Sequence, residues 1–120
     1  MLVSAQVFGL PAPASDCDKR IFAFHIHEGG SCTGNADDPF ADALTHYDPE
    51  DCEHPGHAGD LLPLWGNGGY AFLQFLTDRF TVDEVIGRTV IVHEDPDDFT
   101  TQPAGRAGKK IACGVIEAAD

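Results

Sequence analysis

Two segments, FHIHEGGSCT at residues 24–33 and THYDPEDCEHPGHAGD at residues 45–60, decide the fold and the chemistry expected of this chain. They contain five of the six histidines, and the sixth, His93, ends the run TVIVH at residues 89–93. The chain is strongly acidic, with 20 aspartates and glutamates against 7 lysines and arginines. Histidines gathered at short spacings in such a chain are expected to serve one common purpose.

The first two histidines lie on a predicted strand. Residues 20–27, RIFAFHIH, are rich in β-branched and aromatic side chains, which is typical of a β-strand. Residues two apart in a strand point to the same face. The imidazoles of His25 and His27 are therefore expected to project together, where they can hold one metal ion.

The segment HPGHAGD at residues 54–60 has the composition of a loop that wraps around a ligand. Pro55 and two glycines exclude a regular helix here. Two histidines and an aspartate from one loop, joined by one further ligand, suit a tetrahedral zinc ion. His46 precedes this loop and can reach either ion. A single strand histidine is usually an ordinary core or surface residue, but the combination of these patterns predicts a metal centre.

Taken together and in this order, the motifs resemble the copper/zinc superoxide dismutase family. The matching segments are FHIHE, THYDP, HPGHAGDL, IGRTVIVHEDPDD and AGKKIACGVI, and they extend over nearly the whole chain from Leu2 onward. The resemblance implies an enzyme that converts superoxide to dioxygen and hydrogen peroxide at copper, with a structural zinc beside it. The copper ligands that it implies are His25, His27, His46 and His93. The zinc ligands that it implies are His46, His54, His57 and Asp60, so that His46 bridges the two ions.

Two further residues take their expected roles from the resemblance. Asp97, in HEDPDD, matches a family aspartate that links a copper histidine to a zinc histidine, here His25 and His54; the alternative is one more solvated acid. Lys110, in KIACG, stands where the family has an arginine that guides the anion to copper. Lysine keeps the charge but lacks the planar array of donors. This change predicts slower or more salt-sensitive turnover, unless the nearby Arg106 takes its place.

The four cysteines have two kinds of expected role. The resemblance implies a disulfide between Cys32, in the first long loop, and Cys113, in the last strand. Cys17 and Cys52 are left over, and the sequence is compatible both with a second disulfide that anchors the zinc loop and with two free thiols. Persistent disulfides would favour an oxidising compartment.

The remaining pattern predicts an all-β domain. Short apolar runs alternate with long loops rich in Gly, Asp and Pro, which is typical of a sandwich or barrel. Residues 67–69, Asn-Gly-Gly, favour a tight hairpin turn because they accept positive φ. Residues 78–87 are expected to connect two strands and to cover one end of the core with Phe80, Val82, Val85 and Ile86. The six expected strands are residues 2–10, 20–27, 61–65, 70–77, 88–93 and 111–118.

The resemblance adds an expectation about topology. The family has an eight-stranded Greek-key barrel, and residues 2–10 match its third strand. A single domain of residues 1–120 is therefore expected to lack the first two strands. In the family these lie between the third strand and the last, so their absence would leave two open edges. A shortened N-terminus, a homodimer that pairs its open edges, and another polypeptide that supplies the hairpin each account for this.

The formal charge of −13 narrows the range of partners. It argues against nucleic acid and anionic membranes, and the anionic superoxide would need a local positive patch. No apolar run is long enough for a transmembrane helix, and the N-terminus lacks the basic region and long apolar core of a signal peptide. The chain as it stands is expected in the cytoplasm, or in the periplasm or outside the cell if its N-terminus is truncated.

Other functions are also compatible with the sequence. A copper- and zinc-binding protein of the same fold would have little or no dismutase activity, and Lys110 and the acidic composition leave room for it. A structural β-domain would bind a partner strand along an open edge, but it would leave six well-placed histidines without a purpose. A metal-dependent hydrolase is disfavoured, since the zinc site would have no open position and no obvious general base.

Overall fold

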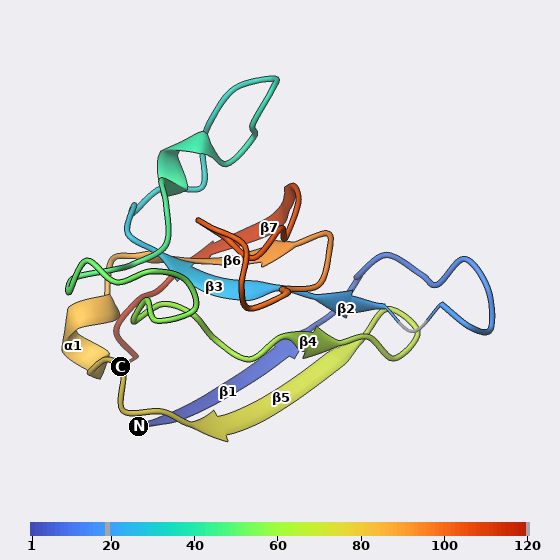
Figure 1. Cartoon of the computed structure of the whole chain (residues 1–120), viewed down its shortest axis with the longest axis horizontal. Helices are drawn as coiled ribbons and strands as arrows, with labels where there is room; N and C mark the ends of the chain where they lie inside the picture. Colours follow the sequence, from blue (N-terminus) through green and yellow to red (C-terminus); the bar gives the residue numbers. More distant parts are fainter. Residues whose placement is uncertain (19, 120) are drawn as a thin grey trace.

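Seven β-strands and one short α-helix make up most of the regular structure within the described residues (Figure 1). The computed structural model describes residues 1–18 and 20–119. Within these residues, no helix is both long enough and apolar enough to cross a membrane. The helix is α1 (Val82–Val85), and a single 3-10 turn spans Ala41–Ala43. The strands are β1 (Leu2–Val7), β2 (Ile21–Phe22), β3 (Phe24–His27), β4 (Leu64–Trp65), β5 (Ala71–Leu76), β6 (Thr89–His93) and β7 (Lys110–Val115).

The strands form three antiparallel sheets. β1 pairs with β5, β2 pairs with β4, and the third sheet has the order β3-β6-β7. Figure 1 shows the β1–β5 ribbon on one side of the molecule and the β3-β6-β7 sheet on the other. Side chains from both pack against one core, in which Phe22 and Leu64 are fully buried. The arrangement is a β-sandwich, which confirms the predicted all-β class.

The strand predicted over residues 20–27 is divided in two, and this division accounts for seven strands where six are expected. β2 pairs with β4, whereas β3 pairs with β6. Between them, the Ala23 N–H donates to the Asp95 carbonyl at 2.9 Å, and the Ala23 carbonyl accepts from the His93 N–H at 2.9 Å. The segment therefore leaves one sheet and enters another at Ala23.

Several strands are shorter than predicted. The first ends at Val7 rather than at residue 10, and Gly9 then turns the chain with a φ of 73°. The strand expected over residues 61–65 is reduced to β4. The tight turn at residues 67–70 is confirmed, because the Asn67 N–H donates to the Tyr70 carbonyl at 2.7 Å and both intervening glycines have positive φ.

The connection over residues 78–87 contains α1 and covers the core only in part. Phe80 and Val85 are buried, as expected of side chains that close one end of the core. Val82 and Ile86 are instead 58% and 37% exposed, so their predicted burial is wrong. Successive side chains of a helix are turned by about 100°, and a single turn can present only one face to the core.

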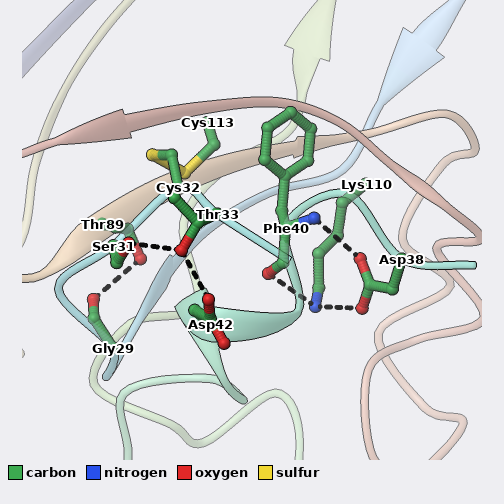
Figure 2. Close-up of a disulfide and its surroundings, with 10 residues drawn as sticks. All are labelled: Gly29, Ser31, Cys32, Thr33, Asp38, Phe40, Asp42, Thr89, Lys110 and Cys113. Carbon is green, nitrogen blue, oxygen red and sulfur yellow. Dashed lines mark hydrogen bonds and ion pairs between the residues drawn. A yellow bond between two sulfur atoms is a disulfide. The ribbon is translucent and has the colours of Figure 1, made fainter. Parts of the chain in front are cut away.

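One disulfide ties the first long loop to the last strand (Figure 2). Cys32 and Cys113 are bonded across 81 positions of sequence, which confirms the expected pair. Closing a loop of this length stabilises the fold by about 4–5 kcal/mol in the chain-entropy model. Cys17 and Cys52 are both exposed and unpaired. The prediction of a second disulfide is therefore wrong, and the alternative of two free thiols is confirmed. The loop after β1 and the loop before β4 extend toward different ends of the sandwich (Figure 1).

The outer edges of β1 and β7 have no strand partner within the part of the chain that the structure describes. β1 pairs only with β5, and β7 pairs only with β6. A groove of about 470 Å³ lies between these edges, lined by Ser4–Val7 on one side and Ala112–Gly114 on the other. Phe24, Val90 and Val92 form the rest of its lining. The groove is where the resemblance places two further strands.

Candidate metal centre

Strand β3 is the element around which the histidines are assembled. One edge of β3 pairs with β6, which ends at His93. The other edge bonds to two loop segments: Tyr47 donates its N–H to the Ile26 carbonyl, and the Ile26 N–H donates to the Gly59 carbonyl, each at 2.8 Å. These contacts bring His46 and Asp60 beside β3, where they form bridges with His27 and His25 respectively.

A first buried cluster contains four histidines. His25, His27, His46 and His93 each offer one ligand atom, and these atoms all lie within 4.8 Å of one another. All four side chains are buried, with residue exposures between 0% and 7%. The buried nitrogens without a hydrogen-bond partner are His25 Nδ1, His27 Nε2, His46 Nε2 and His93 Nε2.

The opposite nitrogens of all four rings are hydrogen-bonded, that of His46 to Asp60 Oδ1 at 2.8 Å. His27 Nδ1 donates to the Leu44 carbonyl at 2.8 Å, and His93 Nδ1 donates to the Gly108 carbonyl at 3.3 Å. His25 Nε2 donates to the Asp97 carboxylate at 2.8 Å. A neutral imidazole that donates through one nitrogen carries a lone pair on the other. The lone pairs therefore face one another without a donor, and a cation that prefers nitrogen ligands fits this cluster.

A second cluster surrounds Asp60. Its carboxylate oxygens lie 2.8 Å from His46 Nδ1, 3.0 Å from His54 Nδ1 and 3.2 Å from His57 Nδ1. The four residues whose ligand atoms all lie within 4.8 Å of one another are His25, His46, His54 and Asp60. His57 falls outside that set, although its Nδ1 lies only 3.1 Å from His46 Nδ1. His46 belongs to both clusters, and a different nitrogen of its ring faces each one.

Asp97 connects the two clusters. One carboxylate oxygen accepts from His25 Nε2 at 2.8 Å and the other accepts from His54 Nε2 at 2.7 Å, which are the two contacts that the resemblance implies. Burial alone would raise the pKa of Asp97, but these hydrogen bonds outweigh burial and lower the pKa to about 2. Gly105, at a φ of 71°, packs against Asp97 and His54 where any larger residue would collide with them.

Two residues that the sequence analysis did not single out stabilise the loop of residues 54–60. Gln102 clasps the main chain of His54: its amide oxygen accepts from the His54 N–H at 2.8 Å, and its amide nitrogen donates to the His54 carbonyl at 2.6 Å. Arg79 donates to the carbonyls of Pro55 at 2.7 Å and His57 at 3.2 Å. No local pattern announces these contacts, because each joins segments that are distant in sequence.

A cavity of about 470 Å³ opens beside the first cluster. Lys110 lines it, as the resemblance implies, but the Lys110 ammonium is paired with the Asp38 carboxylate at 2.9 Å (Figure 2). Arg106 is exposed and is not one of the described residues around this cavity, so it does not replace Lys110. The lining residues are His27, Glu28, Leu44, Thr45, His46, Asp48, His57, His93, Pro103, Ala104, Gly108 and Lys110.

Comparisons with known proteins agree with this architecture. The model of the copper/zinc superoxide dismutase family matches residues 1–116. Superoxide dismutase [Cu-Zn] of Deinococcus radiodurans is 35% identical over 97% of this chain and 70% of that protein. Superoxide dismutase [Cu-Zn] 2 of Aquifex aeolicus is 34% identical over 97% of this chain and 71% of that protein. The solved Cu/Zn superoxide dismutase from Brucella abortus superposes with a TM-score of 0.75 at 27% identity, covering 96% of this chain and 100% of that one.

The sandwich and its inward-facing imidazoles define an all-β protein with a histidine-rich centre of the metal-binding type. The family match over nearly its whole length shows that the chain belongs to the copper/zinc superoxide dismutase family. This membership confirms the predicted class of enzyme, an oxidoreductase, and its cofactors, copper and zinc. The role of each side chain toward each ion stays a prediction.

The buried histidines predict that the metal-free protein loses stability in mild acid. Burial lowers the pKa of His27 to about 3 and that of His93 to about 4, whereas an unfolded histidine titrates near 6.5. Between these values the unfolded chain binds more protons than the folded one. The free energy of unfolding should therefore fall as the pH drops from 6.5 toward 4, by up to about 1.4 kcal/mol per pH unit for each histidine.

Urea unfolding of the metal-free protein at pH 7.5, 5.5 and 4.5 measures this slope. His93→Gln is the control, because it removes one of the two groups and should flatten the curve. The contribution of Asp97 to the free energy of unfolding can be distinguished from that of the histidines by its pH range. The pKa of Asp97, about 2, lies below its ordinary value of 3.8, so the stabilisation that it provides is lost only as the pH falls below about 4. A free energy that stays constant between pH 7.5 and 4.5 would contradict the prediction.

Proposed function

We propose that this chain converts superoxide to dioxygen and hydrogen peroxide at a copper ion held by four histidines. One observation carries the proposal: four buried histidines whose ligand atoms lie within 4.8 Å of one another each keep a nitrogen that no hydrogen bond satisfies. Imidazole suits copper as a ligand, and carboxylate ligands alone would not select it. The proposed copper ligands are His25, His27, His46 and His93.

The proposed zinc ligands are His46, His54, His57 and Asp60. His25 also lies near this second cluster, but its Nε2 is bonded to Asp97 and its free Nδ1 belongs to the first cluster. His57 Nδ1 contacts two members of the second cluster, His46 Nδ1 at 3.1 Å and Asp60 Oδ2 at 3.2 Å. Three imidazoles and one carboxylate complete a tetrahedral set, which supports a structural zinc without an open position.

His46 is the residue proposed to link the two ions. Its Nδ1 faces Asp60, and its Nε2 faces the other three copper-side histidines. When bound, copper supplies the one-electron oxidation and reduction that dismutation requires, and zinc supplies a fixed positive charge. Burial lowers the pKa of His46, so the free ring is neutral at pH 7. A lowered pKa makes a proton on His46 easy to give up, so His46 Nε2, when no cation occupies it, would be suited to donate a proton to the peroxide product.

Asp97 is proposed as a positioning residue for both ions. Its two oxygens hold the outer nitrogens of His25 and His54, one from each proposed set. This arrangement fixes the tautomer of both rings and directs each Nδ1 inward. It also couples the two sites mechanically, since a displacement of one ring is transmitted to the other through a single carboxylate.

Metal content and activity, measured on one sample, test the proposal. After reconstitution with copper and zinc, elemental analysis should find one of each ion per chain, and the sample should accelerate the decay of superoxide. His46→Gln should keep the fold but lose the linked site, and activity should fall by at least about a hundredfold. A chain that folds but binds no copper would overturn the assignment of the four histidines.

A second candidate function is copper and zinc binding with little dismutase activity. The observation that favours it is the Asp38 carboxylate 2.9 Å from the Lys110 ammonium, which offsets a positive charge beside the cavity. Stoichiometric metals without superoxide decay would establish this alternative. The same experiment therefore separates the two functions.

Lys110 is proposed to attract the anion, and its replacement by Arg tests this role. Arg adds donors in a planar array at the same charge, so Lys110→Arg should raise the rate constant at low ionic strength by about twofold. Lys110→Met should lower the rate and reduce its dependence on salt, because the attraction between charges is screened. Stopped-flow measurement of superoxide decay at several ionic strengths gives both quantities. Equal rates and equal salt dependence in all three proteins would exclude the role.

We also propose that residues 1–120 act as one domain that forms a homodimer along its open edges. The single core supports one domain, and the groove between β1 and β7 supports pairing at those edges, since unpaired strands attract other strands. Sedimentation equilibrium should give twice the mass of 12.8 kDa. Replacing Gln6 in β1 by Pro should then shift the protein toward the monomer. A monomer at all concentrations would exclude this contact.

A further inference from the structure

We propose that Asp38 sets the positive charge that the cavity presents to an incoming anion, by holding the Lys110 ammonium and offsetting it. The inference rests on the proposed function, in which Lys110 attracts superoxide. It assigns an electrostatic role to a residue of the first long loop that has no hydrogen bond or ion pair with a proposed metal ligand. Asp38 is therefore a positioning residue that acts through Lys110.

The contact itself is well defined (Figure 2). Lys110 Nζ lies 2.9 Å from Asp38 Oδ2 and 3.4 Å from the Phe40 carbonyl. An ammonium has three donors, so two are engaged by the loop and one is left for a ligand. The Lys110 side chain is 16% exposed and the Asp38 side chain is 42% exposed, which places the pair at the rim between protein and solvent.

The loop holds the Asp38 carboxylate in this position. Asp38 Oδ1 accepts from the Phe40 N–H at 3.1 Å, and the Asp38 N–H donates to Asn35 Oδ1 at 2.9 Å. The same loop is bonded covalently to β7 through Cys32 and Cys113, three positions beyond Lys110. Asp38 thus cannot move away from Lys110 without breaking its hydrogen bonds to Asn35 and Phe40.

Because few other charges of the same sign lie near the cavity, this ion pair largely determines the local positive charge. Lys110 is the sole lysine or arginine among the described residues that line the cavity, while Glu28 and Asp48 line it with negative charge. The chain as a whole carries −13. An ammonium paired with a carboxylate has a field that falls off faster than that of a free ammonium. Asp38 consequently reduces the attraction of the cavity for an anion. Removing the charge of Asp38 should restore the full effect of the Lys110 charge.

The experiment compares Asp38→Asn with Asp37→Asn in the copper- and zinc-loaded protein. Each variant removes one negative charge from adjacent positions of one loop, but Asp37 is not bonded to Lys110. Asn keeps an oxygen for the Phe40 N–H, so the turn is retained. Two properties are measured at several ionic strengths: the affinity for azide, followed by absorbance, and the rate constant for superoxide decay.

We expect Asp38→Asn to increase both properties by about fivefold over Asp37→Asn at low ionic strength, the effect of one unit charge a few ångströms away in water. The difference should close at high salt. It should also vanish when Lys110→Met is added to Asp38→Asn. Equal behaviour of the two Asn variants, a lower azide affinity in Asp38→Asn, or a gain that survives Lys110→Met would each overturn the inference.

These outcomes are distinct from a failure of the proposed function. If the unmodified protein binds both metals and removes superoxide, equal Asn variants refute only the role of Asp38. If it binds azide but does not remove superoxide, the azide affinities still decide whether Asp38 controls the charge. If it binds no copper, the proposed function fails at the metal-content measurement, and Asp38 loses its role with it.

Discussion

The buried imidazole lone pairs are the constraint on which the rest of this structure depends. Five histidines each keep a buried nitrogen without a hydrogen-bond partner, and leaving such an atom unpaired costs about 1–3 kcal/mol. These unpaired nitrogens are gathered around one centre. The carbonyls of Leu44 and Gly108 and the carboxylate of Asp97 accept hydrogen bonds from the outer nitrogens, which directs the inner nitrogens toward each other. The family to which the chain belongs uses copper and zinc, and cations of this type satisfy all of these atoms together.

Long loops carry much of this centre, and the small sandwich stabilises them from several directions. Cys32 and Cys113 join the first loop to β7. Gln102 bonds both main-chain groups of His54, and Arg79 bonds carbonyls on the other part of the same loop. Asp97 then ties His54 to strand β3 through His25. Loops that are cross-linked in this way lose less entropy when a metal binds, because much of their order is already present.

The negative charge of this chain opposes the approach of an anion to the histidine cluster. A protein with a charge of −13 repels anions at long range, and only Lys110 provides a fixed positive charge among the described residues of the cavity. Lys110 in turn lies against Asp38, so the field near the cavity depends on how completely the two charges compensate. The arrangement differs from a free guanidinium, which would retain its charge and offer more donors to the substrate.

Much of the site could be predicted because its signals are local. Residues two apart on a strand share a face, so FHIH alone determined that His25 and His27 lie together, and the composition of residues 54–60 indicated a ligand loop. The disulfide and the contacts of Asp97 followed from motif matches. Only the tertiary structure decided that the strand divides at Ala23, that Cys17 and Cys52 stay unpaired, that Gln102 clasps His54, and that Asp38 reaches Lys110. Each of these features depends on which segments, distant in sequence, come into contact after folding, and the local periodicity of the sequence does not specify such contacts.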